Sequence, residues 1–261
     1  MKSIRLYFKY VSAVLTSTMQ YKLSFLLMCI GRFVVAFSGF IGISFLFSGF
    51  TGIKNYSYGE VLLCFSIVQA AFSLSECLFS GFKGFSGLVK RGDFDRMLLR
   101  PRSLILQVIG SRFELGRIGP LLTAGITLIV GIRTCELHFN IMRIITLILM
   151  ILGGMVLFSA LFLLGATINF FSIEDGGIIN VLTYGGKDHG KYPIDIYGEG
   201  LKKFCTFLIP YTLFQYYPLQ YLLGKTDNSM YAFFPLGTVV FLVLCYAFWR
   251  FGVRNYKSCG N

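Results

Sequence analysis

The chain has 261 residues, of which 55% are hydrophobic and 14% are charged. Soluble domains usually carry about 25% charged residues, so this chain has too little polar surface to coat a water-soluble globule. The same excess of apolar residues excludes intrinsic disorder. Composition therefore predicts an integral membrane protein.

The charge balance is strongly basic, with 24 Lys and Arg against 12 Asp and Glu. On a soluble protein a net charge of +12 would indicate a nucleic-acid partner. On a membrane protein the same excess marks the loops that stay on the cytoplasmic side. The positions of the cations along the chain separate these two interpretations.

The first element in chain order is an amphipathic segment at residues 1–22, where apolar residues recur every three or four positions opposite a basic and polar stripe. Such a helix lies in the membrane interface. Apolar runs long enough to cross a membrane follow it. We therefore expect an all-α integral membrane protein of one domain with six transmembrane helices. The predicted spans are residues 23–48, 58–80, 104–131, 143–172, 200–220 and 230–250.

Local signals refine three of these spans. Ser57 and Glu60 fit the capping box that opens the second span. Gly and Pro residues at 116–120 predict a break or kink in the third. Pro210 and Pro218 interrupt the fifth, which predicts a helix that ends early, followed by a re-entrant segment before the last span.

The cations favour a topology with both termini in the cytoplasm. Seventeen of the 24 Lys and Arg lie in the segments that this topology places inside, which are residues 1–22, 82–103, 172–203 and 250–261. Four lie in the outer loops, and the others lie within spans. The bias follows the positive-inside rule, so we expect contact with membrane lipid and no nucleic-acid partner.

Charged residues within the predicted spans are candidate intramembrane polar contacts, because isolated charges are costly in lipid. Glu76 has two interpretations: a contact for substrate or protons, or a partner for a neighbouring arginine near the end of its span. The pairing interpretation is favoured, since charges near span ends commonly pair or reach the interface. The candidate residues are Arg32, Glu76, Arg112 and Glu114.

The basic segment at residues 82–103 interleaves six cations with apolar residues. An amphipathic helix that turns at Arg91-Gly92-Asp93 could lie along the cytoplasmic face and insert into a groove on a partner. A solvated basic loop fits the composition equally well.

Residues 91–101, RGDFDRMLLRP, resemble the Arg-Gly-x-Leu-Asp-x-x-Leu-x-Arg-Pro stretch of bacterial ABC-type exporter permeases of the type 2 membrane-domain class. Phe94 stands for the usual Leu, and Asp93 stands where Glu is common. The segment from Ile209 to Leu219 is similar to the re-entrant segment of that family. The resemblance covers nearly the whole chain.

The resemblance implies a permease whose cytoplasmic coupling helix docks on a separate ATPase subunit. It also implies a second permease chain, identical or related, and a place in the bacterial plasma membrane. The residues that match the motif, and are expected to couple the ATPase, are Gly92, Phe94, Asp95, Leu98, Arg100 and Pro101.

Other functions find less support in the sequence. An ATP-independent membrane protein, such as a secondary carrier or an assembly or immunity factor, is the alternative, although no internal repeat typical of carriers is visible. A membrane enzyme comes third. Gly224-Lys225-Thr226 lacks the upstream glycine of a phosphate-binding loop, and Ser86 lacks the spacing of a nucleophile elbow. The scattered cysteines and two histidines predict no metal site, and we expect no cofactor.

Overall fold

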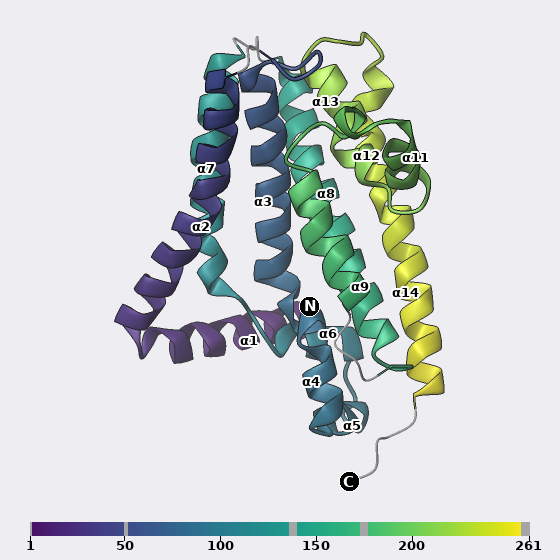
Figure 1. Cartoon of the computed structure of the whole chain (residues 1–261). Helices are drawn as coiled ribbons and strands as arrows, with labels where there is room; N and C mark the ends of the chain where they lie inside the picture. Colours follow the sequence, from purple (N-terminus) through teal and green to yellow (C-terminus); the bar gives the residue numbers. More distant parts are fainter. Residues whose placement is uncertain (1, 50–51, 136–139, 173–176, 257–261) are drawn as a thin grey trace.

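The computed structural model describes residues 2–49, 52–135, 140–172 and 177–256, and in these ranges the chain is helical with no strand. Figure 1 shows long helices standing side by side. We call the end that holds α1, α4 and α5 the basal end, and the end that holds α13 the distal end. Within the described ranges, five helices are long and apolar enough to cross a membrane: α2 (Lys22–Gly49), α3 continued by α4 (Tyr58–Lys90), η1 continued by α7 (Leu115–Thr134), α8 (Ile141–Ile168), and η4 continued by α14 (Ser229–Asn255).

The amphipathic segment forms α1 (Lys2–Met19), which lies across the basal end at a steep angle to the long helices (Figure 1). A turn at Gln20 and Tyr21 separates it from α2. Tyr7 of α1 packs edge-on against Phe113, with ring centroids 5.3 Å apart. This is the orientation that an interfacial helix requires.

The second span begins where the capping box predicts. Ser57 Oγ accepts from Glu60 N at 3.4 Å, and Glu60 Oε2 accepts from Ser57 N at 2.8 Å. The helix that follows, α3 (Tyr58–Lys83), is buried along most of its length, with residues such as Leu62 and Phe65 almost fully enclosed. It is therefore the central helix around which the others pack.

The third predicted span is broken, but earlier than the sequence indicates. Residues 111–114 separate α6 (Leu104–Gly110) from η1 (Leu115–Arg117) and α7 (Ile118–Thr134). Pro120 lies in the first turn of α7, where a missing N–H costs no helical hydrogen bond. The proline therefore helps to begin the helix and does not break it.

Residues 200–220, predicted as an interrupted fifth span, do not form one long helix, because three short helices occupy this stretch near the distal end (Figure 1). Pro210 precedes the second of them and Pro218 lies in the third. No helix there is long enough to cross a membrane, so the count of six spans stays a prediction. The three helices are α11 (Glu199–Phe207), α12 (Tyr211–Phe214) and α13 (Tyr216–Leu222).

Residues 177–197, which precede α11, run from the basal end to the distal end, and we call them the climbing segment. The sequence assigned them to an inner loop. Contacts with α3 show the direction: Tyr184 donates to Glu76, and the carbonyl of Gly190 accepts from Cys64. Farther along, Tyr56 Oη donates to Asp195 Oδ2 at 3.0 Å. Residue numbers rise here as those of α3 fall. The climbing segment consists of α9 (Gly177–Asn180), the π-helical η2 (Val181–Gly185), α10 (Gly186–His189), and residues 190–193 leading to η3 (Ile194–Tyr197).

Burial, followed by the nearby Asp195 carboxylate, raises the pKa of Tyr56 above its ordinary value. The tyrosine thus stays a hydrogen-bond donor to Asp195. Lys54 Nζ donates to the carbonyl of the same residue at 2.8 Å. The end of the climbing segment is therefore fastened to the loop between α2 and α3.

Candidate functional site

The segment that carries the family motif forms two short helices below α3, at the basal end (Figure 1). They are α4 (Phe85–Lys90) and α5 (Asp93–Leu98). Gly92 joins them at φ 67°, in the left-handed region that favours glycine. The glycine of the motif therefore sets the turn between the two helices.

Phe94 faces the helices of its own chain and is completely buried. Its ring lies 5.0 Å from that of Phe85 and 5.1 Å from that of Tyr256, measured between centroids. Phe170, after α8, and Trp249 of α14 complete the cluster. The aromatic residue of the motif thus fixes α5 to the basal ends of α8 and α14.

The end of α5 points away from the bundle and exposes apolar surface. Leu99 is 86% exposed and Leu98 is 40% exposed. The turn beyond them is held by Gln107, whose Nε2 donates to the carbonyls of Met97 and Arg102. We call this exposed surface the α5 tip; it consists of Leu98, Leu99, Arg100, Pro101 and Arg102.

Asp95 is half-buried beside the α5 tip. The six motif residues thus lie close together in one compact unit, but each has different surroundings. Phe94 packs inward, Gly92 shapes the turn, and Leu98, Arg100 and Pro101 are exposed.

A buried ion network lies above this unit, in the basal part of the bundle. Glu76 of α3 is fully buried, and its carboxylate lies 2.8 Å from Arg117 and 2.5 Å from Lys83 Nζ. Tyr184 of η2 donates to Glu76 Oε1 at 2.7 Å and accepts a hydrogen bond from Lys83. One carboxylate therefore ties α3 to η1 and to the climbing segment.

The second half of the network centres on Glu114, in the break before η1. Its carboxylate lies 3.0 Å from Arg32 of α2 and 3.1 Å from Arg112. Arg117 lies 3.3 Å from it and so joins the two halves. All four intramembrane candidates thus lie in one network, and Glu76 has the arginine partner that the pairing interpretation expects.

Sequence reasoning missed Lys83 and Tyr184 as partners of Glu76. The sequence placed Tyr184 in an inner loop, among glycines that looked like linker residues. The signal that was available is the spacing of Gly186 and Gly190, four residues apart on a helix face. A Cβ on Gly186 would collide with the hydroxyl of Tyr211, so this face packs closely.

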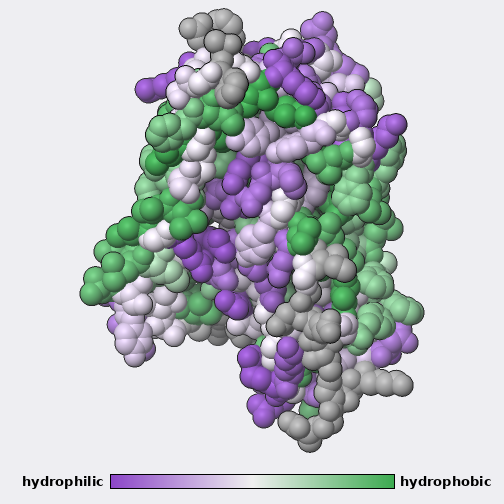
Figure 2. Space-filling view, viewed as in Figure 1, coloured by the Kyte–Doolittle hydropathy of each residue, from purple (hydrophilic) through white to green (hydrophobic). Residues whose placement is uncertain are grey.

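On one face of the molecule, hydrophilic and hydrophobic residues lie in separate zones. Figure 2 shows hydrophilic residues along the middle of this face, between flanks of hydrophobic residues.

Residues 33–260 match the model of the ABC-2 family of transporter proteins. The chain belongs to the ABC-2 transporter family. Neither the curated proteins nor the solved structures include a significant match.

Family membership states the general role of the chain. As an ABC-2 protein it is a multi-pass membrane protein and the permease component of an ABC transporter. ABC-2 permeases are not catalytic themselves and work with an ABC ATPase subunit.

Proposed function

We propose that this permease belongs to an exporter of the bacterial plasma membrane, and that it couples to a separate ATPase subunit through α4, α5 and the α5 tip. Both termini and the basal end then face the cytoplasm. The observation that carries the proposal is the exposure of Leu99, at 86%, outside the long apolar helices and among basic residues. The direction of transport follows from the resemblance of residues 91–101 to exporter permeases.

The α5 tip suits a protein partner. Exposed aliphatic side chains beside arginines match the composition of interfaces, where apolar anchors are surrounded by polar residues. The exposed positions of the tip carry Arg100 and Arg102, so an acidic cleft is the complementary surface.

Packing behind the tip provides a route for motion. Phe94 joins α5 to α8 and α14 through rings 5–7 Å apart, and Glu76 joins α3 to η1 and η2. When α5 moves, the long helices joined by these contacts would therefore move with it as one rigid body. In this way, closure of the two ATPase subunits would change which side of the membrane has access to a substrate path between the two permeases.

A second permease, identical or related, would pack against α2. Ile43 is the only described residue of this helix that is buried within the chain. Val35 is 74% exposed and Phe45 is 74% exposed. Membrane lipid would cover the part of α2 that the second permease leaves free.

The experiment co-purifies a tagged permease with the ATPase in mild detergent and measures ATP hydrolysis. Leu99→Asp places a charge at the centre of the proposed contact, and the complex should weaken about tenfold or more, as expected for an interface anchor. Lys22→Glu, at the basal end but outside the tip, is the control and should leave the complex intact.

The particle mass in the same preparation tests the second permease, with two permeases and two ATPases expected. The coupling proposal fails if Leu99→Asp retains both the ATPase and its activity.

A further inference from the structure

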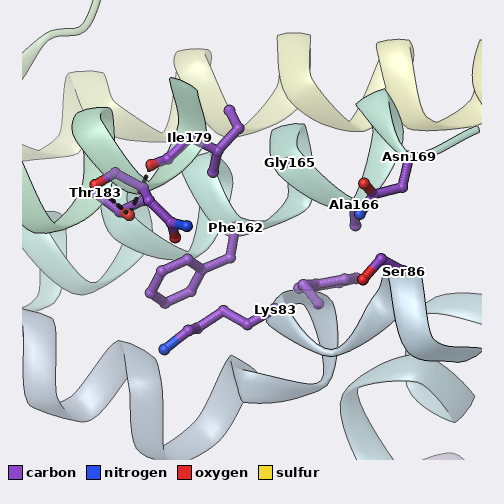
Figure 3. Close-up of a pocket in the computed structure, with 10 residues that line it drawn as sticks. Lys83, Ser86, Phe162, Gly165, Ala166, Asn169, Ile179 and Thr183 are labelled. Carbon is purple, nitrogen blue, oxygen red and sulfur yellow. Dashed lines mark hydrogen bonds between the residues drawn. The ribbon is translucent and has the colours of Figure 1, made fainter. Parts of the chain in front are cut away.

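A cavity of about 180 Å³ lies beside the ion network, between the basal ends of α3 and α4, the lower part of α8, and α9 with η2 (Figure 3). Its size is that of a small organic group. Apolar side chains form much of its wall, and polar side chains stand at separate points. The apolar lining comprises Phe82, Phe162, Ala166 and Ile179.

Lys83 provides the cation of this cavity. An ammonium has three N–H donors. Two of them are used by Glu76 and Tyr184. The third is not used by any residue that the structure describes, and Lys83 lines the cavity. Its Nζ lies 5.7 Å from the centroid of the Phe162 ring, on the wall of the cavity.

Among the residues that the structure describes, the surroundings of Lys83 hold more positive than negative charge. Glu76 is paired with both Lys83 and Arg117. Lys187 lies close by: its Nζ is 5.3 Å above the Phe72 ring, and that ring is 5.3 Å from the ring of Tyr184. Among the described residues Lys187 makes no ion pair.

The other nearby carboxylates that the structure describes are already engaged. Asp188 lies 2.8 Å from Lys191, and Glu114 holds Arg32 and Arg112. Lys83 and Arg117 therefore share Glu76, and Lys187 adds a further cation nearby. An anion that enters here gains more than it would in water, because the interior screens charge weakly.

Asn169 supplies a different contact on the wall opposite Lys83 (Figure 3). The residue is 9% exposed, and its Oδ1 accepts no hydrogen bond from any described residue. A buried acceptor without a donor is costly. Thr183 cannot serve it, because its hydroxyl donates to the carbonyl of Ile179 at 2.7 Å. A ligand with a hydroxyl group would satisfy Asn169.

We propose that this cavity binds the head group of an anionic amphiphile, and that such amphiphiles are the substrate class of the permease. Lys83 holds the anion, Asn169 accepts from a hydroxyl, and the apolar wall receives the start of the hydrocarbon chain. The assignment as substrate rests on the proposed function, whereas the binding itself does not.

The binding test uses the full-length permease purified without the ATPase, with thermal unfolding as the readout, because a ligand of the native state raises Tm. The probes are lysophosphatidic acid, lysophosphatidylcholine with the same chain, and glycerol phosphate. We expect lysophosphatidic acid to bind at least about tenfold more tightly than the other two.

Two variants and one control connect binding to the cavity. Lys83→Gln should weaken lysophosphatidic acid about tenfold, as expected for loss of a hydrogen bond to a charged group. Asn169→Leu removes the unsatisfied acceptor, so it should fold as well as the parent chain and still bind less tightly. Lys202→Gln, at the distal end, should bind like the parent chain. Equal binding of the anionic and zwitterionic probes, or no effect of either variant, would overturn the proposal.

ATP hydrolysis by the permease–ATPase complex separates a substrate from a resident lipid. A substrate should stimulate hydrolysis, and Lys83→Gln should remove the stimulation. Binding without stimulation would overturn the substrate assignment and leave a lipid site. Failure of the complex to form would instead contradict the proposed function, since the binding test uses the permease alone.

Discussion

Phe94 and Leu99 lie five residues apart in the same motif, yet one is fully buried and the other is 86% exposed. The resemblance to the permease family carried Phe94 over as a coupling residue without saying what it touches. In the structure it contacts Phe85, Phe170 and Tyr256 of its own chain. At the scale of single residues, the motif therefore combines an inward anchor with an outward contact.

Glu76 gives the sharpest prediction at this scale. Glu76→Gln leaves Arg117 and Lys83 without their shared counterion in a buried site. The loss of one partner from a buried ion pair costs about 3–5 kcal/mol. Thermal unfolding in mild detergent measures the effect, and Glu199→Gln, an exposed carboxylate, serves as the control. A Glu76→Gln variant as stable as the control would show that the ion network contributes nothing to the fold.

At the scale of elements, the climbing segment at residues 177–197 is the main departure from the sequence-based expectation. Its glycines and its charged residues Lys187, Asp188 and Lys191 are typical of a loop. Inside the bundle Gly186 and Gly190 allow close packing, and Tyr184 and Lys187 meet partners on α3, whereas Asp188 and Lys191 pair with each other. Composition could not distinguish a polar segment surrounded by protein from a solvated loop, because both contain the same types of residue.

Elements specified by local chemistry were predictable. The capping box at Ser57 and Glu60 lies where α3 begins. The amphipathic pattern of residues 1–22 matches α1. The break in the third span was expected at residues 116–120 but lies at 111–114, since Pro120 is tolerated in a first helical turn. The partners of Glu76 depend on chain crossings far apart in sequence, which no local pattern encodes.

A matched pair of glycine substitutions tests the packing of the climbing segment. The Cβ of an alanine at position 186 would collide with Tyr211, so Gly186→Ala should destabilise the protein by about 1–3 kcal/mol. Gly185→Ala is the control, because its Cβ would lie 3.8 Å from Val181 Cγ1, at ordinary contact distance. Thermal unfolding of the two variants should differ clearly; equal Tm values would indicate that the segment is not packed inside the bundle.

At the scale of the whole molecule, the climbing segment changes the distribution of charge. The sequence placed Lys187, Lys191, Lys202 and Lys203 on the inner side. In the structure Lys202 and Lys203 belong to α11, near the distal end, and Lys202 Nζ donates to Tyr216 of α13 at 3.2 Å. The basal end still carries more cations, including those of the α5 tip, so the proposed topology, with the basal end in the cytoplasm, still agrees with the positive-inside rule.

Thiol labelling of intact cells tests this topology. In a cysteine-free background, Lys203→Cys and Lys90→Cys lie at opposite ends of the bundle. A membrane-impermeant reagent should label the cysteine at 203 and spare that at 90 until the membrane is opened. If both positions are protected from the reagent, residue 203 lies on the inner side of the membrane, as the sequence indicated.

Photo-crosslinking in native membranes tests whether the α5 tip contacts an ATPase subunit. A photo-reactive amino acid replaces Leu99, and a second variant carries it at Lys22 as the control. We predict a crosslink from position 99 to an ATP-binding polypeptide and none from position 22. Crosslinks from position 99 that reach only lipid or the permease itself would contradict the account.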